Sequence, residues 1–360
     1  MKGHRVRVLL FTASSVATIC LVWASANVTS APVRGQATPA ASGTAKAVTA
    51  ANAFLATLDA GQRAKVSLEL TDTTRANWSN LPTGVKLQSG ATERNGLKLG
   101  DMTAAQQEAA LALVAAPLSR TGYQKVMNIV AADQVLEEKS APSRQASAAV
   151  RFGRAEYYVA ILGKPSETGR WMVQFGGHHL AINVTINGSD HALTPSHTGA
   201  QPATFTLNGE SIRPLGNEND KGFALINALE PALQKQAILN YDVKATVLSP
   251  GLDGKVIQPE GVRASGFNPS QQAKLLDLVG EWVGILDDAT AAGKMSEIKR
   301  SLAETYFAWS GPTSSGSAAY FRIQGPTVLI EYAPQGGGTD HIHTFYRDPT
   351  NDYGTKTAAR

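Results

Sequence analysis

Residues 318–354 read AAYFRIQGPTVLIEYAPQGGGTDHIHTFYRDPTNDYG, and their pattern decides how the rest of the chain is interpreted. Two apolar runs flank the glycine-rich turn at 336–338, which is typical of strands joined by a hairpin loop. If HIHTFY is a strand, His341 and His343 project from the same face, because side chains alternate with a period of two. A His-x-His pair on one face is a ready chelate, so this stretch predicts both a sheet and a metal site.

A period of two recurs in two sets of segments. It predicts antiparallel strands at 147–163, 170–177, 178–188, 304–311, 318–325, 327–334 and 340–348. We expect turns at 164–169 and at Gly176–Gly177, and a loop over 194–214, where strong periodicity is absent. Each set contains a strand, a glycine-containing turn, a second strand and a His-bearing strand. This echo suggests that two comparable units bring two histidine clusters to equivalent places.

Apolar residues at helical spacing predict helices that begin near Lys46 and cover 103–118, 220–240 and 270–289. Thr103 with Gln106 resembles a capping box. Pro231 suits the first turn of a second helix within its stretch, because proline lacks the N–H that a helix interior needs. Ser270 is the expected N-cap of the last helix.

This element pattern predicts an α+β fold, with antiparallel β-sheet units and flanking α-helices. A chain of 360 residues is long enough for one large domain or two ordinary ones, at about 100–200 residues each. Hydrophobic residues make up 43% and charged residues 17%, which indicates a globular protein rather than a disordered one. We expect a single large domain over residues 46–360.

The charge pattern argues against nucleic-acid binding. The formal net charge is +4, but the charged residues are scattered and form no basic block. Sequence signatures of serine hydrolases, zincin proteases, phosphate-loop enzymes and dinucleotide-binding enzymes are also absent. These classes are therefore disfavoured.

The N-terminus has the three regions of a secretory signal. Three basic residues within the first seven positions precede an uncharged apolar run, which ends in the A-x-A arrangement of Ala24 and Ala26. We expect residues 1–26 to be a signal peptide, residues 27–45 a flexible tether, and the protein to be secreted or periplasmic without stable membrane embedding after cleavage. An uncleaved N-terminal anchor is the alternative, since the run approaches the roughly 20 residues of a membrane helix.

The predicted metal ligands are His178, His179, Glu331, His341 and His343. Only one of His178 and His179 is expected to join a given site, because neighbours on a strand point to opposite faces. The only cysteine, at position 20, lies in the signal and offers no thiolate to the mature chain. Three imidazoles and one carboxylate suit Zn, Cu, Fe(II) or Mn, and imidazole favours the first three. An open coordination position would make the site catalytic, and a fourth protein ligand would make it structural.

A metal-free interpretation stands beside this one. The same residues could form a buried polar network in an envelope protein with a binding or structural role, because a buried histidine is usually just hydrogen-bonded. His191 and His197 lie in a segment rich in Thr, Ser and Pro and are expected to be ordinary loop residues.

Arg347 and Asp348 follow the His-x-His pair directly. In a functional interpretation they bind a small-molecule ligand, with Arg347 gripping an anion and Asp348 acting as a general acid or base. In a structural one, Arg347 clamps a carboxylate while Asp348, Asn351 and Asp352 form side-chain turns in the segment DPTNDYG.

Three blocks of the chain carry a family resemblance: GRWMVQFGGHHLAINVTI, FAWSG, and YFRIQGPTVLIEYAPQ with DHIHTFYRDPTNDYG. They resemble the family catalogued as domain of unknown function 3500, which typically contains secreted bacterial proteins, over about residues 50–354. The family pattern usually has Asn before the His-x-His pair, whereas this chain has Asp340, a change that concerns a residue beside the ligands. The resemblance implies a fold and export, but no established reaction.

Overall fold

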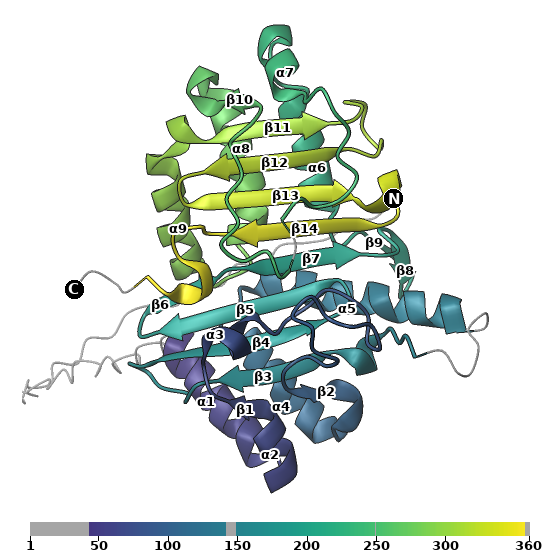
Figure 1. Ribbon diagram of the computed structural model, residues 1–360, viewed down its shortest axis with the longest axis vertical. Coiled ribbons are helices and arrows are strands. Elements are labelled where there is room, and N and C mark those ends of the chain that lie inside the picture. Colours follow the sequence, from purple (N-terminus) through teal and green to yellow (C-terminus); the bar gives the residue numbers. More distant parts are fainter. Residues whose placement is uncertain (1–42, 142–148, 249, 357–360) are drawn as a thin grey trace, which may run out of the picture. The chain divides into compact units, whose positions relative to one another are not determined.

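A twelve-stranded sheet runs through the part of the chain that the computed structural model describes, residues 43–141, 149–248 and 250–356 (Figure 1). Its main path follows the order β1 (Ser67–Leu68), β3 (Tyr158–Leu162), β4 (Arg170–Gly177), β5 (Leu180–Asn187), β7 (Ser196–Ala200), β14 (Ile342–Arg347), β13 (Val328–Pro334), β12 (Tyr320–Gly325), β11 (Tyr306–Ser310) and β10 (Val262–Arg263). At its margins β2 (Leu97–Lys98) pairs with β3, and β6 (Asp190–Leu193) pairs with β5. Only the β1–β3 pairing is parallel among these strands. A separate hairpin joins β8 (Phe205–Leu207) and β9 (Glu210–Ile212).

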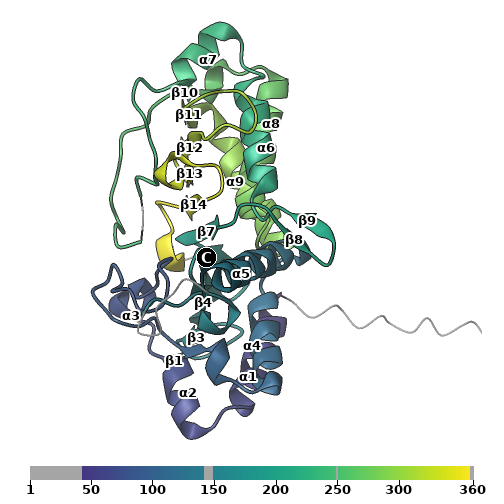
Figure 2. The ribbon, with the colours of Figure 1, turned by 90° about the vertical axis from the view of Figure 1, so that its right-hand side faces the viewer.

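Helices lie mainly along one face of this sheet (Figure 2). In chain order the helices of the described ranges are α1 (Gly43–Ala56), α2 (Ala60–Val66), α3 (Asp72–Ala76), α4 (Ala104–Ala115), α5 (Arg120–Ser140), α6 (Gly216–Ile226), α7 (Pro231–Ala237), α8 (Pro269–Val283) and α9 (Asp288–Arg300). The α+β class expected from the sequence is therefore confirmed.

Two hydrophobic cores fill the space between the sheet and these helices. The first packs α6 and α8 against β11 to β14 and contains Trp282, Trp309 and Phe321. The second packs α1, α4 and α5 against β3 to β5 and contains Phe54 and Trp171. Each buried aromatic side chain removes about 150–250 Å² from water, so these rings contribute much of the driving force that holds the helices on the sheet.

Loops rather than helices cover the opposite face of the central strands. A third apolar cluster joins Trp78, Leu248, Phe345 and Tyr353 there, from segments far apart in the sequence. The indole N–H of Trp78 donates to the Tyr353 hydroxyl at 2.9 Å. Because both faces are covered, β13 and most of β4, β5 and β14 are buried along their length. Their sequences are accordingly richer in apolar residues than a half-exposed strand requires.

The two similar sets of segments in the sequence lie on either side of β7 in the sheet. On one side lie β5, β4 and β3 in that order, and on the other side lie β14, β13 and β12. The strand that follows the histidine pair of the first set, β5, and the His-bearing strand of the second set, β14, are thus the two that pair with β7. Two histidine segments that are about 160 residues apart in the chain consequently meet across a single strand.

Several local predictions are confirmed. The second set of strands forms where it is expected, as the antiparallel series β11 to β14. Thr103 and Gln106 exchange hydrogen bonds as a capping box at the start of α4. Pro231 is the first residue of α7, where its missing N–H has no cost.

Other boundaries differ from the prediction. α1 begins at Gly43, so it includes the end of the segment expected to be a tether. Asn268, not Ser270, is the N-cap of α8, because Pro269 fills the first helical position and Asn268 exchanges hydrogen bonds with Gln271. The first expected strand is confined to β3, since a 3₁₀ turn at Arg154–Glu156 precedes it. α5 and α9 were not predicted.

The segment 194–214 is the largest error of the sequence prediction. It was expected to be a loop, but it contains β7 at the centre of the sheet and the β8–β9 hairpin. The sequence SHTGA of β7 has no apolar alternation, yet every residue in it is buried. The strand forms because β5 and β14 supply backbone partners on both of its edges.

The predicted signal, residues 1–26, lies outside the described residues, as do the tether up to residue 42 and positions 147–148 of the first expected strand. None of the helices in the described ranges combines the length and the apolar character that a bilayer crossing needs.

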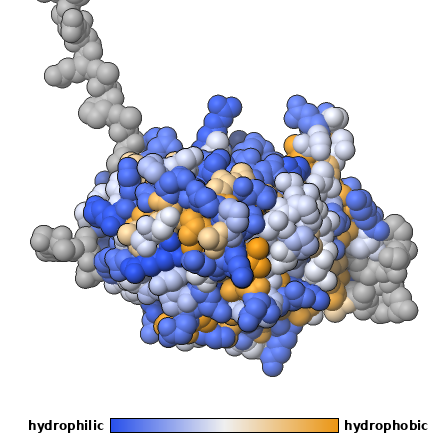
Figure 3. Space-filling model, turned by 90° about the horizontal axis from the view of Figure 1, so that it is seen from above, coloured by the Kyte–Doolittle hydropathy of each residue, from blue (hydrophilic) through white to orange (hydrophobic). Residues whose placement is uncertain are grey.

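Figure 3 views the end of the molecule that carries α7, where hydrophilic residues predominate and hydrophobic ones form small separate areas. Isolated exposed apolar residues of this kind need no partner.

Candidate metal centre

Three imidazole rings converge beside β7. His179 lies in the turn between β4 and β5, His341 directly precedes β14, and His343 lies within β14. The Nε2 atom of His341 is 2.8 Å from Nε2 of His179 and 3.1 Å from Nε2 of His343. We call these three residues the three-histidine group. His179 is buried, whereas His341 and His343 are partly exposed, so the group lies at the edge of the protein interior.

The β4–β5 turn places both of its histidines near this group. Gly177 pairs with Leu180, so His178 and His179 form a two-residue turn, not the start of a strand as predicted. Their rings consequently lie side by side, with centroids 3.6 Å apart, instead of pointing to opposite faces. His179 has a φ of 66°, a left-handed conformation that a non-glycine residue adopts only at some cost. Its N–H donates to the Asn80 carbonyl at 3.0 Å, which helps to hold the turn.

A glycine opposite His343 provides the space for the rings. Gly199 of β7 is the cross-strand partner of His343. A Cβ atom at Gly199 would lie 2.8 Å from the carbonyl oxygen of Ile342, 3.1 Å from Cδ2 of His343 and 3.3 Å from Cβ of His179. Any larger residue would therefore push the strands or the rings apart. The close approach of His179 to β14 depends on this missing side chain.

Hydrogen bonding alone does not account for the three-histidine group. A ring nitrogen has one in-plane position, which carries either a proton or a lone pair. Nε2 of His341 is close to two other ring nitrogens, and it cannot donate to one and accept from the other at the same time. Three lone pairs directed at one cation would satisfy all three atoms. Ligand nitrogens on a tetrahedral zinc ion lie about 3.3–3.4 Å apart, so only a small separation of the rings would be needed.

Burial keeps the group in its neutral, metal-binding form. Desolvation, together with the nearby His178 ring, lowers the pKa of His341 from its ordinary value to about 4. Burial and the neighbouring imidazoles also hold the pKa values of His179 and His343 well below the ordinary range. A proton therefore competes weakly for these nitrogens at neutral pH, and their lone pairs are available.

Asp133 of α5 joins the cluster from the helical side. Its Oδ1 lies 2.6 Å from Nδ1 of His178, and its Oδ2 accepts the N–H of Gly153 at 2.8 Å. Asp133 is almost completely buried, so this contact fixes the orientation of the His178 ring. Asp133, His178 and His179 form a second group whose possible ligand atoms lie within 4.8 Å of one another.

The sequence contained an unused signal for Asp133. Val126, Ile129 and Val130 form the buried stripe of α5, and position 133 continues that stripe at helical spacing. A carboxylate on the apolar face of a helix is rarely buried without a partner. The partner here is His178, which is remote in sequence and adjacent in space.

His197 lies beside the three-histidine group, contrary to its interpretation as an ordinary loop residue. It belongs to β7, is 1% exposed, and packs edge-on against His343 with ring centroids 4.8 Å apart. His191 has no part in the three-histidine group, as expected from the sequence. Its Nδ1 lies 3.1 Å from Asp287 and its Nε2 lies 3.0 Å from the Thr44 hydroxyl, so it links three segments by hydrogen bonds.

The structure does not bring Glu331 into the cluster, although the sequence suggested it as a ligand. The Glu331 carboxylate accepts the N–H groups of Val247 and Leu248 at 2.8 and 2.7 Å, and the Tyr320 hydroxyl at 2.7 Å. Neither of the two histidine-containing groups in the described residues includes it. Glu331 instead anchors the loop that crosses this face of the sheet.

Arg347 and Asp348 make contacts within the protein. Arg347 donates to the Asp352 carboxylate and to the Lys255 carbonyl, which is the clamp expected in the structural interpretation. Asp348 accepts the N–H and the hydroxyl of Thr350 and pairs with Lys294 at 2.5 Å. These contacts hold the chain after β14 and leave little of either side chain for a ligand.

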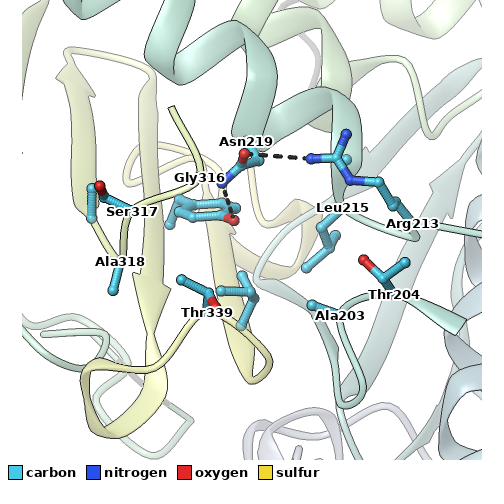
Figure 4. Close-up of a pocket in the computed structure, with 13 residues that line it drawn as sticks. Ala203, Thr204, Arg213, Leu215, Asn219, Gly316, Ser317, Ala318 and Thr339 are labelled. Atoms are coloured by element: carbon cyan, nitrogen blue, oxygen red, sulfur yellow. Dashed lines mark hydrogen bonds between the residues drawn. The ribbon is translucent and has the colours of Figure 1, made fainter. Parts of the chain in front are cut away.

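A pocket of about 220 Å³ lies near β14, shown in Figure 4. Asn219 donates to the Tyr332 hydroxyl at 2.9 Å and lies 3.4 Å from Arg213, as the dashed lines mark. Ile342 lines this pocket, and it points to the opposite face of β14 from His341 and His343. The pocket and the three-histidine group thus share a strand but no lining side chain.

A family model matches residues 40–355 under the description protein of unknown function DUF3500. The chain belongs to the DUF3500 family. No curated protein and no solved structure matches the chain. The family description assigns no function to the three-histidine group.

The stability of the metal-free DUF3500 protein should fall as the pH decreases from about 6.5 towards 5. The unfolded chain binds protons on its histidines near pH 6.5, whereas the folded chain resists protonation at His341, with its pKa of about 4, and at His197, with its pKa of about 3. Because the unfolded state then binds more protons, acid favours unfolding, by about 1.4 kcal/mol per group and pH unit. Denaturant titrations of chelator-treated protein across this range would test it. A constant or rising free energy of unfolding would contradict the buried, neutral state of these rings.

Proposed function

We propose that the protein binds one transition-metal ion through Nε2 of His179, His341 and His343. The observation that carries this proposal is the approach of three ring nitrogens at 2.8 and 3.1 Å, because Nε2 of His341 has one in-plane position and cannot make a well-aligned hydrogen bond to both neighbours. Their neutral state at physiological pH supports it, because a metal ion takes the lone pair that a proton would otherwise occupy.

The ligand set favours Zn, Cu or Fe(II). Imidazole suits these ions, whereas the hard ions Mg²⁺ and Ca²⁺ prefer oxygen ligands. Three neutral imidazoles leave the charge of a divalent ion uncompensated, and Asp133 offers a nearby negative charge through its contact with His178. Asp133 orients the His178 ring, which packs against the ring of the proposed ligand His179 with centroids 3.6 Å apart.

The same geometry is compatible with catalysis. Three protein ligands are typical of catalytic zinc sites, which keep one position for water or substrate. The partial exposure of His341 and His343 gives the group a route to solvent. A metal-dependent enzyme is therefore one form of the proposed function, in which the bound ion would polarise a substrate or activate water.

We further propose that the protein acts outside the cytoplasm, as one α+β domain that begins with α1 at Gly43 and follows a tether. The support is the basic, apolar and A-x-A regions of residues 1–26. Binding by imidazole alone suits such a location, because it uses no thiolate that an oxidising compartment could convert to a disulfide.

Substitution of the ligands tests the proposal. Chelator-treated wild-type protein would be titrated with Zn(II), Cu(II) and Co(II) in competition with a chelator of known affinity. His341→Ala and His343→Ala should each weaken binding by more than about 100-fold, since outer partners alone account for 10–100-fold. His191→Ala is the matched control. It removes a partly buried histidine with contacts to Asp287 and Thr44, so it should lower stability while metal affinity stays unchanged.

The alternative of a metal-free polar network predicts a different result. In that case the wild-type protein would show no saturable binding of any of the three metals. Each His→Ala variant would then only leave buried partners unsatisfied and lower the stability of the metal-free protein by about 1–3 kcal/mol.

A further inference from the structure

His197 projects from the same face of the sheet as the three-histidine group. It pairs with Phe345 across the β7–β14 ladder, and cross-strand partners share a face. Phe345 is two residues from His343, so His343 lies on that face as well. The ring of His197 thus stands at the inner side of the group, covered from solvent.

The packing of His197 matches the packing within the group. Its ring centroid lies 4.8 Å from that of His343, at an interplanar angle of 80°. Pairs inside the group have centroid distances of 4.8, 5.1 and 4.8 Å, with angles of 72°, 67° and 76°. His197 is therefore a fourth ring in the same cluster of edge-to-face imidazoles.

Neither ring nitrogen of His197 has a hydrogen-bond partner among the described residues. The side chain is 1% exposed, and a neutral imidazole carries one donor and one acceptor. Leaving both unsatisfied in the interior is costly, and an aromatic hydrocarbon of similar shape would avoid this cost. His178 and His191, by contrast, each have a carboxylate at Nδ1. The ring is thus buried, unpartnered and packed against an imidazole cluster, which points to a ligand that would satisfy it, although His197 is not among the three residues whose ligand atoms lie within 4.8 Å of one another.

We infer that His197 is a fourth imidazole ligand of the ion held by His179, His341 and His343. This inference rests on the proposed metal binding, and with a fourth protein ligand a tetrahedral site would be structural, not catalytic. On binding, the His197 ring turns towards the group and one of its unpartnered nitrogens joins the coordination shell. Four neutral imidazoles form an all-nitrogen site, which narrows the ion to Zn(II) or Cu(II), and Cu(II) binds such donors more tightly than Zn(II).

The test uses the full-length protein and the variants His197→Phe and His197→Gln. Phe keeps the ring shape without nitrogen, and Gln keeps polarity if Phe does not fit. Binding of Cu(II) and Zn(II) should weaken by more than about 100-fold in both, which exceeds the usual loss of an outer partner. Electron paramagnetic resonance of the Cu(II) forms should show one nitrogen donor fewer than the wild type. The metal-free His197→Phe protein should be as stable as the wild type or more stable, because two unsatisfied polar atoms are removed.

His191→Phe is the matched control, because it also replaces a strand histidine that is little exposed. It should lower stability and leave affinity and nitrogen count unchanged. If His197→Phe keeps its nitrogen count, or its affinity falls by less than 100-fold, His197 is not a ligand and the inference is overturned. In that case His343→Ala still decides the three-histidine proposal independently. If the wild-type protein binds neither metal, both fall together.

Discussion

Replacing Ile342 by Ala is expected to lower the free energy of unfolding by about 2–5 kcal/mol while the folded protein keeps its metal affinity. Ile342 lies between the two histidines of β14, but its side chain points to the helical face and is 5% exposed within the first core. The lost methyl and methylene groups leave a cavity among residues that cannot fully close it. His341 and His343 project from the other face and keep their positions.

Denaturant unfolding of the metal-free protein and competitive metal titration at low denaturant measure the two effects separately. Ile342→Val serves as a graded control, with an expected loss of about 0.5–1.5 kcal/mol. His343→Ala should give the reverse result, with metal binding lost and metal-free stability changed much less. Loss of metal binding in a folded Ile342→Ala protein would show that the two faces of β14 are not independent.

Replacing Glu331 by Ala is expected to destabilise the protein by at least about 3 kcal/mol without loss of metal binding in the folded fraction. The substitution leaves the N–H groups of Val247 and Leu248 and the hydroxyl of Tyr320 without their acceptor. Each unsatisfied buried group costs about 1–3 kcal/mol. The effect is large because burial makes solvent a poor substitute at this site.

The Glu331→Gln variant separates the contribution of the hydrogen bonds to stability from the contribution of the negative charge. Burial raises the pKa of Glu331, so the protein already opposes its charged form, and the amide oxygen of Gln retains one acceptor. An intermediate loss of stability is expected by denaturant titration. If Glu331→Gln instead removed the metal and left stability intact, Glu331 would be a ligand, as its sequence position first suggested.

The sequence predicted those elements whose local pattern agrees with their final environment. β12 to β14 combine apolar side chains with turn residues at both ends. The start of α4 is marked in the sequence by Thr103 and Gln106, which form its capping box. The shared face of His341 and His343 follows from strand periodicity alone, and their Nε2 atoms indeed lie 3.1 Å apart. In these cases the local signal is sufficient.

The remaining features depend on contacts between distant segments. β7 is a strand because of its neighbours, since SHTGA has little strand propensity of its own. The placement of His178 and His179 in a turn follows from the pairing of Gly177 with Leu180, which the sequence alone does not fix. His197 and Asp133 reach the cluster through the sheet order and through the docking of α5. Periodicity marks Asp133 as part of the buried stripe of α5, but it does not show that Asp133 or His197 lies beside the other histidines.

Elemental analysis of the protein, purified without added metal or chelator, tests the central claim most directly. We expect about one equivalent of Zn, Cu or Fe per chain, and none in a variant in which His179, His341 and His343 are all replaced by Ala. The contradicting result is a wild-type protein that contains no transition metal and takes up none on titration with Zn(II) or Cu(II). The converging imidazoles would then form a metal-free network.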